Sequence, residues 1–375
     1  MEDRYIFCGT KKMRCGFTTG SCAAAASKSA AQALLTGQSV HFAEIYTPKK
    51  EILHLSVERC IIRKDSALCS VIKDSGDDPD ITNGIEICAE VSLIENGIEI
   101  CGGSGVGRVT KAGLDQPVGE AAINSVPRKM ISQAMMEIAE LNEYKGGFKV
   151  VISVPNGEET AKRTFNPRIG IVGGISIIGT TGIVEPMSNS AIIETIRTEA
   201  NIRREEGRKT LLLTVGNYSE RFIAENRPEL TERCVMCSNF IGEAIDIGIS
   251  LGFEKILIIG HIGKMVKLGS GIMNTHSSCA DGRIETLVSC GVKAGIDGTL
   301  LRSLFDCATT DAALDILYEN GAADTLLKVL TERIDGYLQA RAKESAKVGA
   351  VIFSYKNDML LKTVFADEIL LESEV

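Results

Sequence analysis

Short apolar runs alternate with longer amphipathic segments through the second half of the chain. The apolar runs have the length and composition of buried strands and lie at 210–215, 255–260 and 348–355. The segments around them are predicted helices and lie at 190–207, 219–226 and 239–252, with further helices to about 347. Strands and helices in this order form a parallel sheet with helices on both faces. Ligands of such sheets bind beyond the carboxyl ends of the strands.

The first part of the chain has a different pattern, in which apolar and polar residues alternate with a period of two. Four such segments lie between residues 39 and 93, and they predict several antiparallel strands. An alanine-rich helix precedes them from about Cys22, and a helix-like run follows them at 128–141. This part is therefore predicted to be a mixed lobe of helices and antiparallel strands.

The length of the chain favours two lobes, because 375 residues exceed the roughly 250–300 that one hydrophobic core supports. A short hydrophobic strand follows the glycines at 146 and 147, and we expect it to open the second lobe. The predicted fold class is α/β: a mixed α+β lobe with mainly antiparallel strands at 1–146, and a lobe of alternating strands and helices with a largely parallel sheet at 147–375.

An apolar stretch broken by glycines, NPRIGIVGGISIIGTTGIVEPMSNS, spans residues 166–190. Two interpretations are open for it. Glycine lets a ligand approach the backbone, so that Gly179-Thr180-Thr181-Gly182 offers N–H groups and hydroxyls and Glu185 offers a carboxylate for a ribose diol or an ammonium. The same pattern is typical of a packed strand pair with a tight turn, and taken alone it favours that simpler structure.

Three hydroxyls lie at the predicted start of the alanine-rich helix, on Thr18, Thr19 and Ser21, with Gly20 between them. Unpaired N–H groups and the helix dipole make such a start an anion site. Hydroxyls at this position also cap helices without binding any ligand, and the motif alone does not decide between the two interpretations.

A long glycine-rich stretch at 102–128 carries three cations, Arg108, Lys111 and Arg128. Loops of this length are functional or disordered, and the strand-like and helix-like flanks argue against disorder. The three cations are candidates to pair with ligand carboxylates.

Two predicted strands of the second lobe end in glycine-rich polar segments. Gly216 and Asn217 follow the first strand, and the second ends in GHIGK, which contains His261 and Lys264. Further along the chain, His276 lies in MNTH and Asp281 in ADGRIE. A histidine directly after a buried strand is a surface residue, a hydrogen-bonding core residue or a functional group, and the sequence leaves all three open.

No metal site is predicted. The acidic segment DSGDDPD at 74–80 lacks the ligand spacing of a calcium loop and favours a solvated turn over substrate or metal contact. Cys234 and Cys237 have the spacing of a zinc knuckle, but no second pair follows them, so that packing as small apolar residues is favoured.

Composition narrows the classes of partner. A net charge of −8, a pI near 5.3 and the lack of a Lys/Arg cluster argue against nucleic acid or an anionic membrane as the main partner. Twelve scattered cysteines suit a reducing compartment. The first residues lack the apolar core of a signal peptide, and no run of about 18 apolar residues follows. We expect a cytoplasmic protein.

Taken together, the segments resemble the CbiD family, the cobalt-precorrin-5B C1-methyltransferases of the oxygen-independent cobalamin pathway. The match runs from residue 14 to about 290. It is carried by the stretch at 166–190 and by GFTTGSCAAAA, GVGRVTKAGLDQPVGEAAINSVPR, GNY, GHIGK and GIMNTHSSCADGRIE. The chain departs from the family pattern at Ala112, Ala122 and Ser125, where prolines are expected. These changes affect the rigidity of a loop and remove no charged or nucleophilic group.

The resemblance implies methyl transfer from S-adenosylmethionine to a ring carbon of a cobalt-bound tetrapyrrole, with cobalt present only as part of the substrate. A sulfonium is already a strong methyl donor, so the protein has mainly to align sulfur, methyl and carbon at about 3–3.5 Å. No nucleophilic side chain is needed, which agrees with a sequence that shows no Ser-His-Asp or Cys-His arrangement.

The residue types suggest an allocation of roles, which is a hypothesis. Donor contacts in the second lobe are assigned to Gly179, Thr180, Thr181, Gly182, Glu185, Gly216 and Asn217. Contacts to the carboxylates of the tetrapyrrole are assigned to the first lobe, on Thr18, Thr19, Arg108, Lys111 and Arg128. Acid/base help or steering of the macrocycle is assigned to His261, Lys264, His276 and Asp281.

Two alternatives stay open at this point. One is a nucleotide- or phosphate-binding enzyme that uses the glycine-rich loops, although neither GxxxxGK[ST] nor GxGxxG is present in full. The other is a non-catalytic corrinoid-binding protein, which needs the same pocket without a donor site. The sequence also leaves homo-oligomerisation open.

Overall fold

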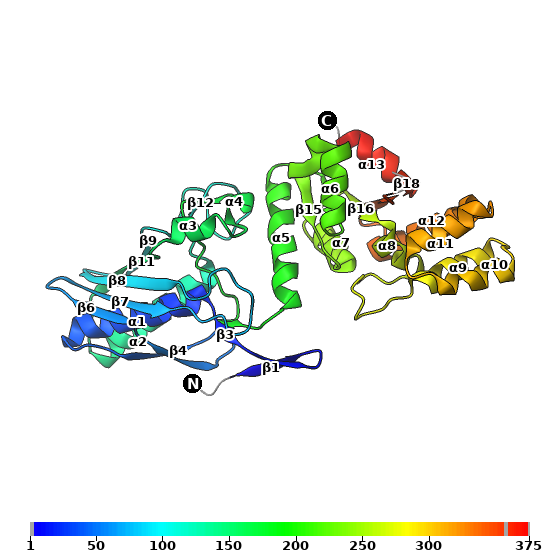
Figure 1. Cartoon of the computed structure of the whole chain (residues 1–375). Helices are drawn as coiled ribbons and strands as arrows, with labels where there is room; N and C mark the ends of the chain where they lie inside the picture. The colour runs from blue at the N-terminus through cyan, green and yellow to red at the C-terminus, as the bar shows by residue number, and fades with distance from the viewer. Residues whose placement is uncertain (1–3, 356–358, 374–375) are drawn as a thin grey trace. The chain divides into compact units, whose positions relative to one another are not determined.

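A computed structural model describes residues 4–355 and 359–373 of the chain. The chain forms two compact units, residues 1–188 and 189–375, and Figure 1 shows their elements. Each unit has its own hydrophobic core: the buried clusters of the first unit draw on residues 15–183, and those of the second on residues 196–370.

The predicted boundary near residue 146 is therefore wrong, and the units meet in sequence at Ser188 and Asn189. Strand β11 (Gly147–Ser153) does not open a new unit. It lies inside the first sheet, antiparallel to β8 (Glu86–Ile94) and parallel to β9 (Ile98–Gly102). The glycine that resembled a linker has a packing role, because a Cβ at Gly147 would lie 2.3 Å from the carbonyl oxygen of Gly97.

The first unit is built on a five-stranded sheet in the order β6-β7-β8-β11-β9. Its other strands are β6 (Arg59–Ile62) and β7 (Ser66–Ile72), and every pair in the sheet is antiparallel except β11 with β9. This confirms the antiparallel strands predicted from the period-two pattern. A separate antiparallel hairpin joins β4 (Phe42–Tyr46) and β5 (Ile52–Ser56).

Two helices pack beside this sheet, α1 (Thr19–Thr36) and α2 (Ser125–Leu141) (Figure 1). Thr18 caps α1, and Gly37 ends it in the left-handed conformation, at a φ of 69°. Helix α1 contacts α2, β7, β8 and β4, and its alanines from Ala23 to Ala33 are fully buried. Small side chains let the layers on both sides of α1 approach it closely.

Short elements complete the first unit. They are β1 (Tyr5–Cys8), β2 (Lys11–Arg14), β3 (Gly16–Phe17), β10 (Arg108–Val109), α3 (Gly157–Ala161), α4 (Asn166–Ile169), β12 (Ile171–Val172) and β13 (Ile183–Val184). The glycine-rich stretch to residue 188 belongs here, since β12 pairs with β10 and β13 with β3.

The second unit contains a five-stranded sheet in the order β15-β14-β16-β17-β18. The strands are β14 (Thr210–Thr214), β15 (Cys234–Met236), β16 (Lys255–His261), β17 (Lys347–Phe353) and β18 (Met359–Lys362). The first four are parallel, and β18 is an antiparallel edge strand. This arrangement confirms the predicted α/β class.

Helices cover both faces of the second sheet. They are α5 (Asn189–Glu205), α6 (Asn217–Asn226), α7 (Ile241–Ser250), α8 (Ile262–Met265), α9 (Arg283–Lys293), α10 (Gly298–Ser303), α11 (Thr310–Glu319), α12 (Ala323–Ala342) and α13 (Ala366–Ser373). Three short 3-10 helices lie at 228–233, 266–270 and 304–306. Side chains of α5, α7, α9 and α12 form one core with the sheet, and side chains of α6 and α13 form another on its opposite face.

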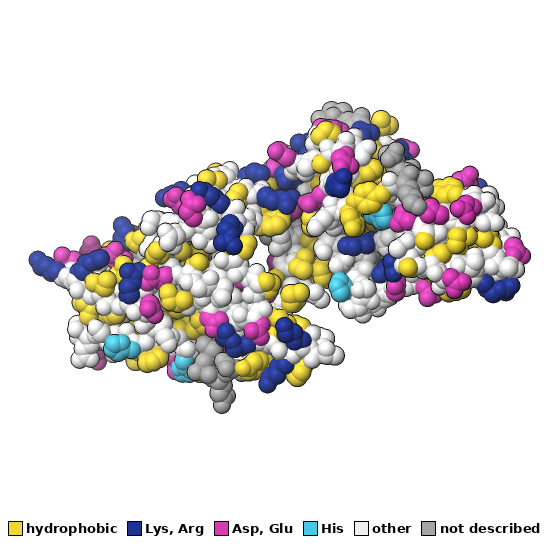
Figure 2. All heavy atoms as spheres, in the orientation of Figure 1, with side chains coloured by type: hydrophobic (Ala, Val, Ile, Leu, Met, Phe, Trp, Pro, Cys, Tyr) yellow, Lys and Arg dark blue, Asp and Glu magenta, His cyan; other side chains and the backbone are white. Residues whose placement is uncertain are grey.

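The surface drawn in Figure 2 shows basic and acidic side chains interspersed, without a broad region of one sign. Within residues 4–355 and 359–373, no helix is long and apolar enough to cross a membrane.

Candidate functional site at the carboxyl edge of the second sheet

The second sheet has a switch point between β14 and β16. The chain leaves β14 toward β15 on one side, and it leaves β16 toward β17 on the other. Ligands of parallel sheets bind where the strand order reverses in this way, outside the carboxyl ends of the strands. Gly216 and Asn217 follow β14 here, and His261 and Lys264 lie at the end of β16 and in α8.

The structure brings these two predicted motifs together. Gly216 has a φ of 81°, and a Cβ at this position would lie 3.0 Å from Nζ of Lys264. No other side chain of the described residues crowds that point, so that Gly216 leaves the backbone open at the switch point.

The ring of His261 is held by a hydrogen bond to the backbone that follows it. Its Nδ1 accepts a hydrogen bond from the backbone N–H of Gly263 at 3.1 Å and so caps α8. Its Nε2 is buried, has no hydrogen-bond partner among the described residues, and lies 3.9 Å from Oδ2 of Asp311. Burial lowers the pKa of His261, and the carboxylate of Asp311 opposes that shift in part. The ring is therefore neutral at neutral pH.

Aromatic side chains surround His261. Its ring centroid lies 5.9 Å from that of Tyr218, 5.3 Å from that of Tyr355 and 5.5 Å from that of Phe353. Tyr218 and Tyr355 are 61% and 51% exposed, so that their faces are available at this edge. The sequence interpretation gave neither tyrosine a role, although Tyr218 lies in the GNY motif just beyond one predicted strand and Tyr355 ends another.

A pocket of about 380 Å³ lies at the same edge of the second sheet. We call it the cation pocket. Its lining residues are Asn239, Gly263, Lys264, Lys267, Thr275, His276, Ser277, Asp281 and Arg283. Three of the four predicted catalytic residues line it, and His261 does not. The volume is within the range of about 300–1,000 Å³ that is typical of ligand sites.

The three cations of this pocket differ in their partners. The side chain of Lys264 makes no hydrogen bond or ion pair within the described residues, and burial lowers its pKa. Lys267 is buried, and its Nζ donates to the backbone oxygens of Thr275 and Ala280 at 3.1 and 2.7 Å. Burial also lowers the pKa of Lys267. These bonds fix the loop that forms one wall of the pocket.

Arg283 pairs with Asp281 through two hydrogen bonds, from Nε at 2.5 Å and from Nη2 at 2.9 Å. The guanidinium holds the pKa of Asp281 below its usual range. Asp281 is therefore an ionised partner of Arg283, which makes it a poor proton donor near neutral pH.

His276 is exposed at the rim of the cation pocket. Its Nδ1 lies 2.6 Å from Oγ of Ser278, and its backbone N–H donates to Oδ1 of Asn274 at 3.1 Å. The sequence interpretation missed Lys267 and Arg283. Arg283 lies within the motif GIMNTHSSCADGRIE, and Lys267 follows Lys264 by one helical turn. The position of each residue was therefore a usable signal in the sequence.

In the first unit, the predicted ligand loop packs against the start of α1. Thr18 caps the helix by accepting from the N–H of Ser21 at 3.2 Å, and Ser21 donates to the oxygen of Gly182 at 2.6 Å. Thr19 exchanges hydrogen bonds with the backbone of Ile178, at 3.1 and 2.9 Å. These hydroxyls are occupied within the protein, which supports the capping interpretation of this motif.

The glycines of this region meet protein atoms. A Cβ at Gly179 would lie 2.2 Å from Oγ1 of Thr18, and a Cβ at Gly182 would lie 2.9 Å from Cγ2 of Thr47. No hydrogen bond is made by Thr180, and Thr181 bonds to the backbone of Ile183, within the part of the chain that is described. The segment therefore packs closely against its own unit.

Glu185 lies in the first unit, which corrects its assignment to the second lobe together with that of Gly179 to Gly182. Its carboxylate accepts from Lys49 at 3.1 Å and from Arg4 at 3.4 Å. Gly216 and Asn217 lie in the second unit, so that the predicted donor residues divide between the two units.

The three predicted cations of the glycine-rich loop differ in role. Arg128 donates to the backbone oxygens of Ile123 and Ile100 at 2.8 and 3.0 Å and ties the loop to β9. Arg108 is exposed and donates to the oxygen of Gly119 at 2.8 Å. Lys111 makes no hydrogen bond or ion pair with described residues, and its stem packs against Gly170.

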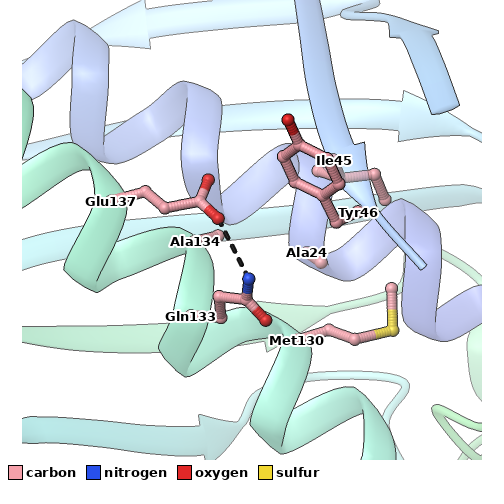
Figure 3. A pocket seen from close by; sticks show the side chains of 7 residues that line it. All are labelled: Ala24, Ile45, Tyr46, Met130, Gln133, Ala134 and Glu137. Carbon is pink, nitrogen blue, oxygen red and sulfur yellow. Dashed lines mark hydrogen bonds between the residues drawn. The ribbon is translucent and has the colours of Figure 1, made fainter. Parts of the chain in front are cut away.

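A second, much smaller cavity lies in the first unit. Figure 3 shows it between α1, α2 and β4, with Gln133 hydrogen-bonded to Glu137 at 3.2 Å. Its volume of about 10 Å³ is that of a single water, so it is no ligand site.

Across the described ranges, no group of three or more His, Cys, Asp and Glu is placed to hold a metal ion. Cys234 and Cys237 are buried, and burial raises the pKa of each thiol to about 12. Sγ of Cys237 donates to the backbone oxygen of Thr214 at 3.3 Å. Both cysteines pack as small apolar residues, as predicted.

A parallel sheet covered by helices on both faces, with a cationic pocket at its carboxyl edge, defines an α/β protein with a candidate ligand site at that edge. The family model described as CbiD matches residues 7–186, and the one described as CbiD, C-terminal domain, matches residues 274–364. The chain belongs to the CbiD family.

Its relatives carry one name. A protein of Ruminiclostridium cellulolyticum named cobalt-precorrin-5B C(1)-methyltransferase is 45% identical over 97% of this chain and 94% of its own length. A protein of Photorhabdus laumondii with the same name is 41% identical over 93% of each chain. A crystal structure of a cobalamin biosynthesis protein, CbiD, from Archaeoglobus fulgidus is 30% identical, with a TM-score of 0.40, and the match covers 73% of this chain and 86% of that one.

Proposed function

We propose that this chain is an S-adenosylmethionine-dependent methyltransferase that methylates ring carbon C1 of cobalt-precorrin-5B in cobalamin biosynthesis. The observation that carries the proposal is the 45% identity, over 97% of the chain, to a relative named for this reaction. The resemblance of the motifs described above points the same way.

In this reaction the ring carbon attacks the methyl group, the bond from sulfur to methyl breaks, and the sulfonium becomes a neutral thioether. The positive charge passes to the macrocycle, which regains its former charge by releasing a proton. Alignment of the reacting atoms supplies most of the rate enhancement when the donor is already activated. The cobalt belongs to the substrate.

The donor site that we propose lies at the switch point of the second sheet. Gly216 leaves the backbone open there, and Asn217 begins α6 beside it. The exposed faces of Tyr218 and Tyr355 are suited to stack against an adenine ring. Glu185 and the segment Gly179 to Gly182 have protein partners in the first unit, and their part in donor binding stays a prediction.

Acid/base roles are proposed on the same edge. His261 is neutral, and its buried Nε2 has no hydrogen-bond partner within the described residues, while its part in acid/base chemistry stays a prediction. Lys264 has a lowered pKa and lines the cation pocket with His276. Of the three predicted cations of the first unit, Lys111 has no partner among the described residues and Arg108 is exposed with one backbone bond, so that these two are better suited to meet a carboxylate of the tetrapyrrole than Arg128, which makes two.

The names of the relatives favour this activity over the two alternatives. A nucleotide-handling enzyme and a non-catalytic corrinoid carrier both lack a counterpart among the relatives described above. The exposed position of the tyrosines beside an open glycine also suits a donor with an adenine ring.

The direct test is to incubate the purified protein with cobalt-precorrin-5B and S-adenosylmethionine that carries an isotopically labelled methyl group. We expect one labelled methyl group in the tetrapyrrole and one S-adenosylhomocysteine for each product, measured by mass spectrometry. A corrinoid that returns unlabelled while bound to the protein would identify a carrier and overturn the proposal.

A further inference from the structure

The cation pocket has an excess of positive charge. Three cations line it, Lys264, Lys267 and Arg283, against a single carboxylate on Asp281. Arg283 takes up that carboxylate with two hydrogen bonds. Two ammonium groups therefore line the pocket without a carboxylate partner, in a chain whose net charge is −8.

Lys264 is the cation that is free to bind a ligand. It is half-buried and makes no hydrogen bond or ion pair within the described residues, whereas Lys267 is held by two backbone oxygens. Burial of an ammonium without a counter-charge is unfavourable, and it lowers the pKa of Lys264. An anion bound at this point would offset that cost.

Neutral hydrogen-bonding groups surround the two lysines. Asn239 and Thr275 face each other, with Oγ1 of Thr275 3.3 Å from Oδ1 of Asn239, and the backbone N–H of Thr275 donates to the oxygen of Asn239 at 3.0 Å. Ser277 adds a hydroxyl to the lining. Cations combined with neutral donors are the usual partners of a carboxylate, and the volume of about 380 Å³ also accepts the chain that carries it.

We propose that the cation pocket binds a carboxylate group and that Lys264 forms its main ion pair. This inference rests on the proposed function, since both reactants of that function carry carboxylates. One source is the amino-acid part of the methyl donor, and the other is an acid arm of the tetrapyrrole. The sequence interpretation had assigned the carboxylates of the tetrapyrrole to the first lobe.

The experiment compares Lys264→Met with a matched control, Lys209→Met. Both changes remove one ammonium group. Lys209 precedes β14 at the opposite edge of the same sheet, and it is an exposed partner of Glu254 at 2.9 Å. Because the side chain of Lys264 has no partner among residues 4–355 and 359–373, its replacement leaves none of their groups unpaired, so that the fold should persist.

Affinities are measured by calorimetry with two pairs of probes. The first pair is S-adenosylmethionine and its decarboxylated analogue, and the second is cobyrinic acid and its heptamethyl ester. We expect Lys264→Met to weaken the binding of at least one carboxylate probe about tenfold, which corresponds to about 1.4 kcal/mol. It should not change the affinity for the matched probe without the carboxylate, and Lys209→Met should change neither.

The outcomes separate the possible sources. A loss confined to S-adenosylmethionine assigns the carboxylate to the donor, and a loss confined to cobyrinic acid assigns it to the tetrapyrrole. Unchanged affinity of Lys264→Met for both carboxylate probes, while the unmodified protein binds them, overturns the inference and leaves the proposed function standing. An unmodified protein that binds neither S-adenosylmethionine nor cobyrinic acid would overturn the proposed function and this inference with it.

Discussion

The glycine-rich regions of the two units look alike in sequence and differ in structure. In the first unit, Gly105 and Gly174 lie where one backbone crosses another, so that a Cβ on either would lie 2.0 to 2.3 Å from a carbonyl oxygen. In the second unit, Gly216 faces only the flexible end of Lys264, at 3.0 Å. Gly105 and Gly174 therefore serve internal packing, whereas Gly216 leaves the backbone open.

The hydrogen bonding of polar groups also differs between the two units. The hydroxyls of Thr18, Thr19 and Ser21 in the first unit are bonded to their own unit. At the carboxyl edge of the second sheet, Lys264 and Nε2 of His261 have no hydrogen-bond partner within the described residues. Unsatisfied polar groups beside an open backbone are therefore our reason for placing the candidate site in the second unit.

The largest effect is expected at a crowded glycine of the first unit. Gly105→Ala adds a Cβ 2.0 Å from the oxygen of Val154 at a φ of 72°, and it should cost about 4 kcal/mol of unfolding free energy. Gly97→Ala is the control, because its φ of 79° is similar and nothing lies within 4 Å; it should cost only about 1–2 kcal/mol. Urea denaturation measures both. Equal losses would show that crowding plays no part.

An intermediate effect is expected at the open glycine of the second unit. Gly216→Ala and Gly207→Ala introduce the same backbone strain, because both glycines have a φ of 81°, at a cost of about 1–2 kcal/mol each. Only Gly216 lies at the switch point, so Gly216→Ala alone should weaken S-adenosylmethionine binding, by about tenfold. Calorimetric titration of both variants is the measurement, and a parallel loss in Gly207→Ala would remove Gly216 from the donor site.

The smallest effect concerns the titration of His261. Burial lowers its pKa in the folded protein, so the unfolded chain binds a proton more readily than the folded one below about pH 6.5. The contribution of His261 to the free energy of unfolding is fully present above that pH. It is lost as the pH falls toward the lower pKa that His261 has in the folded protein. His261→Asn keeps an acceptor for the N–H of Gly263 and removes the titration.

Urea denaturation of the unmodified chain and of His261→Asn between about pH 8 and pH 5 measures this difference. The stability of the unmodified chain should fall more steeply with decreasing pH than that of the variant. Equal slopes would mean that His261 is as easily protonated in the folded protein as in the unfolded one.

Much of the fold was predictable because its strands and helices follow from local patterns of apolar and polar residues. The period-two alternation predicted β4, β5, β7 and β8, and the alternation of apolar and amphipathic segments predicted the parallel sheet of the second unit. The place of β11 was not predictable in this way, because its pairing with β8 and β9 depends on contacts between distant parts of the chain. The boundary was misplaced for the same reason.

The candidate site shows the same limit. Gly216, His261 and Lys264 were predicted to lie at this edge because residues directly after buried strands follow a general rule for parallel sheets. Lys267 and Arg283 were missed because one lies in a short 3-10 helix and the other begins α9 after a loop, and the sequence does not specify the course of the chain between them. The charges of both residues were visible in the sequence, but their proximity in the folded chain was not.

Helix α1 has a consequence for how the first unit acquires its rigidity. Alanine has no rotamers to lose, so the buried alanines from Ala23 to Ala33 are ordered at almost no cost in side-chain conformational entropy. The helix thus acts as a thin, inflexible spacer between neighbouring layers. The close packing around these alanines leaves no free space. Each added methylene on α1 must therefore displace a neighbouring layer, at a cost of roughly 1–3 kcal/mol of stability.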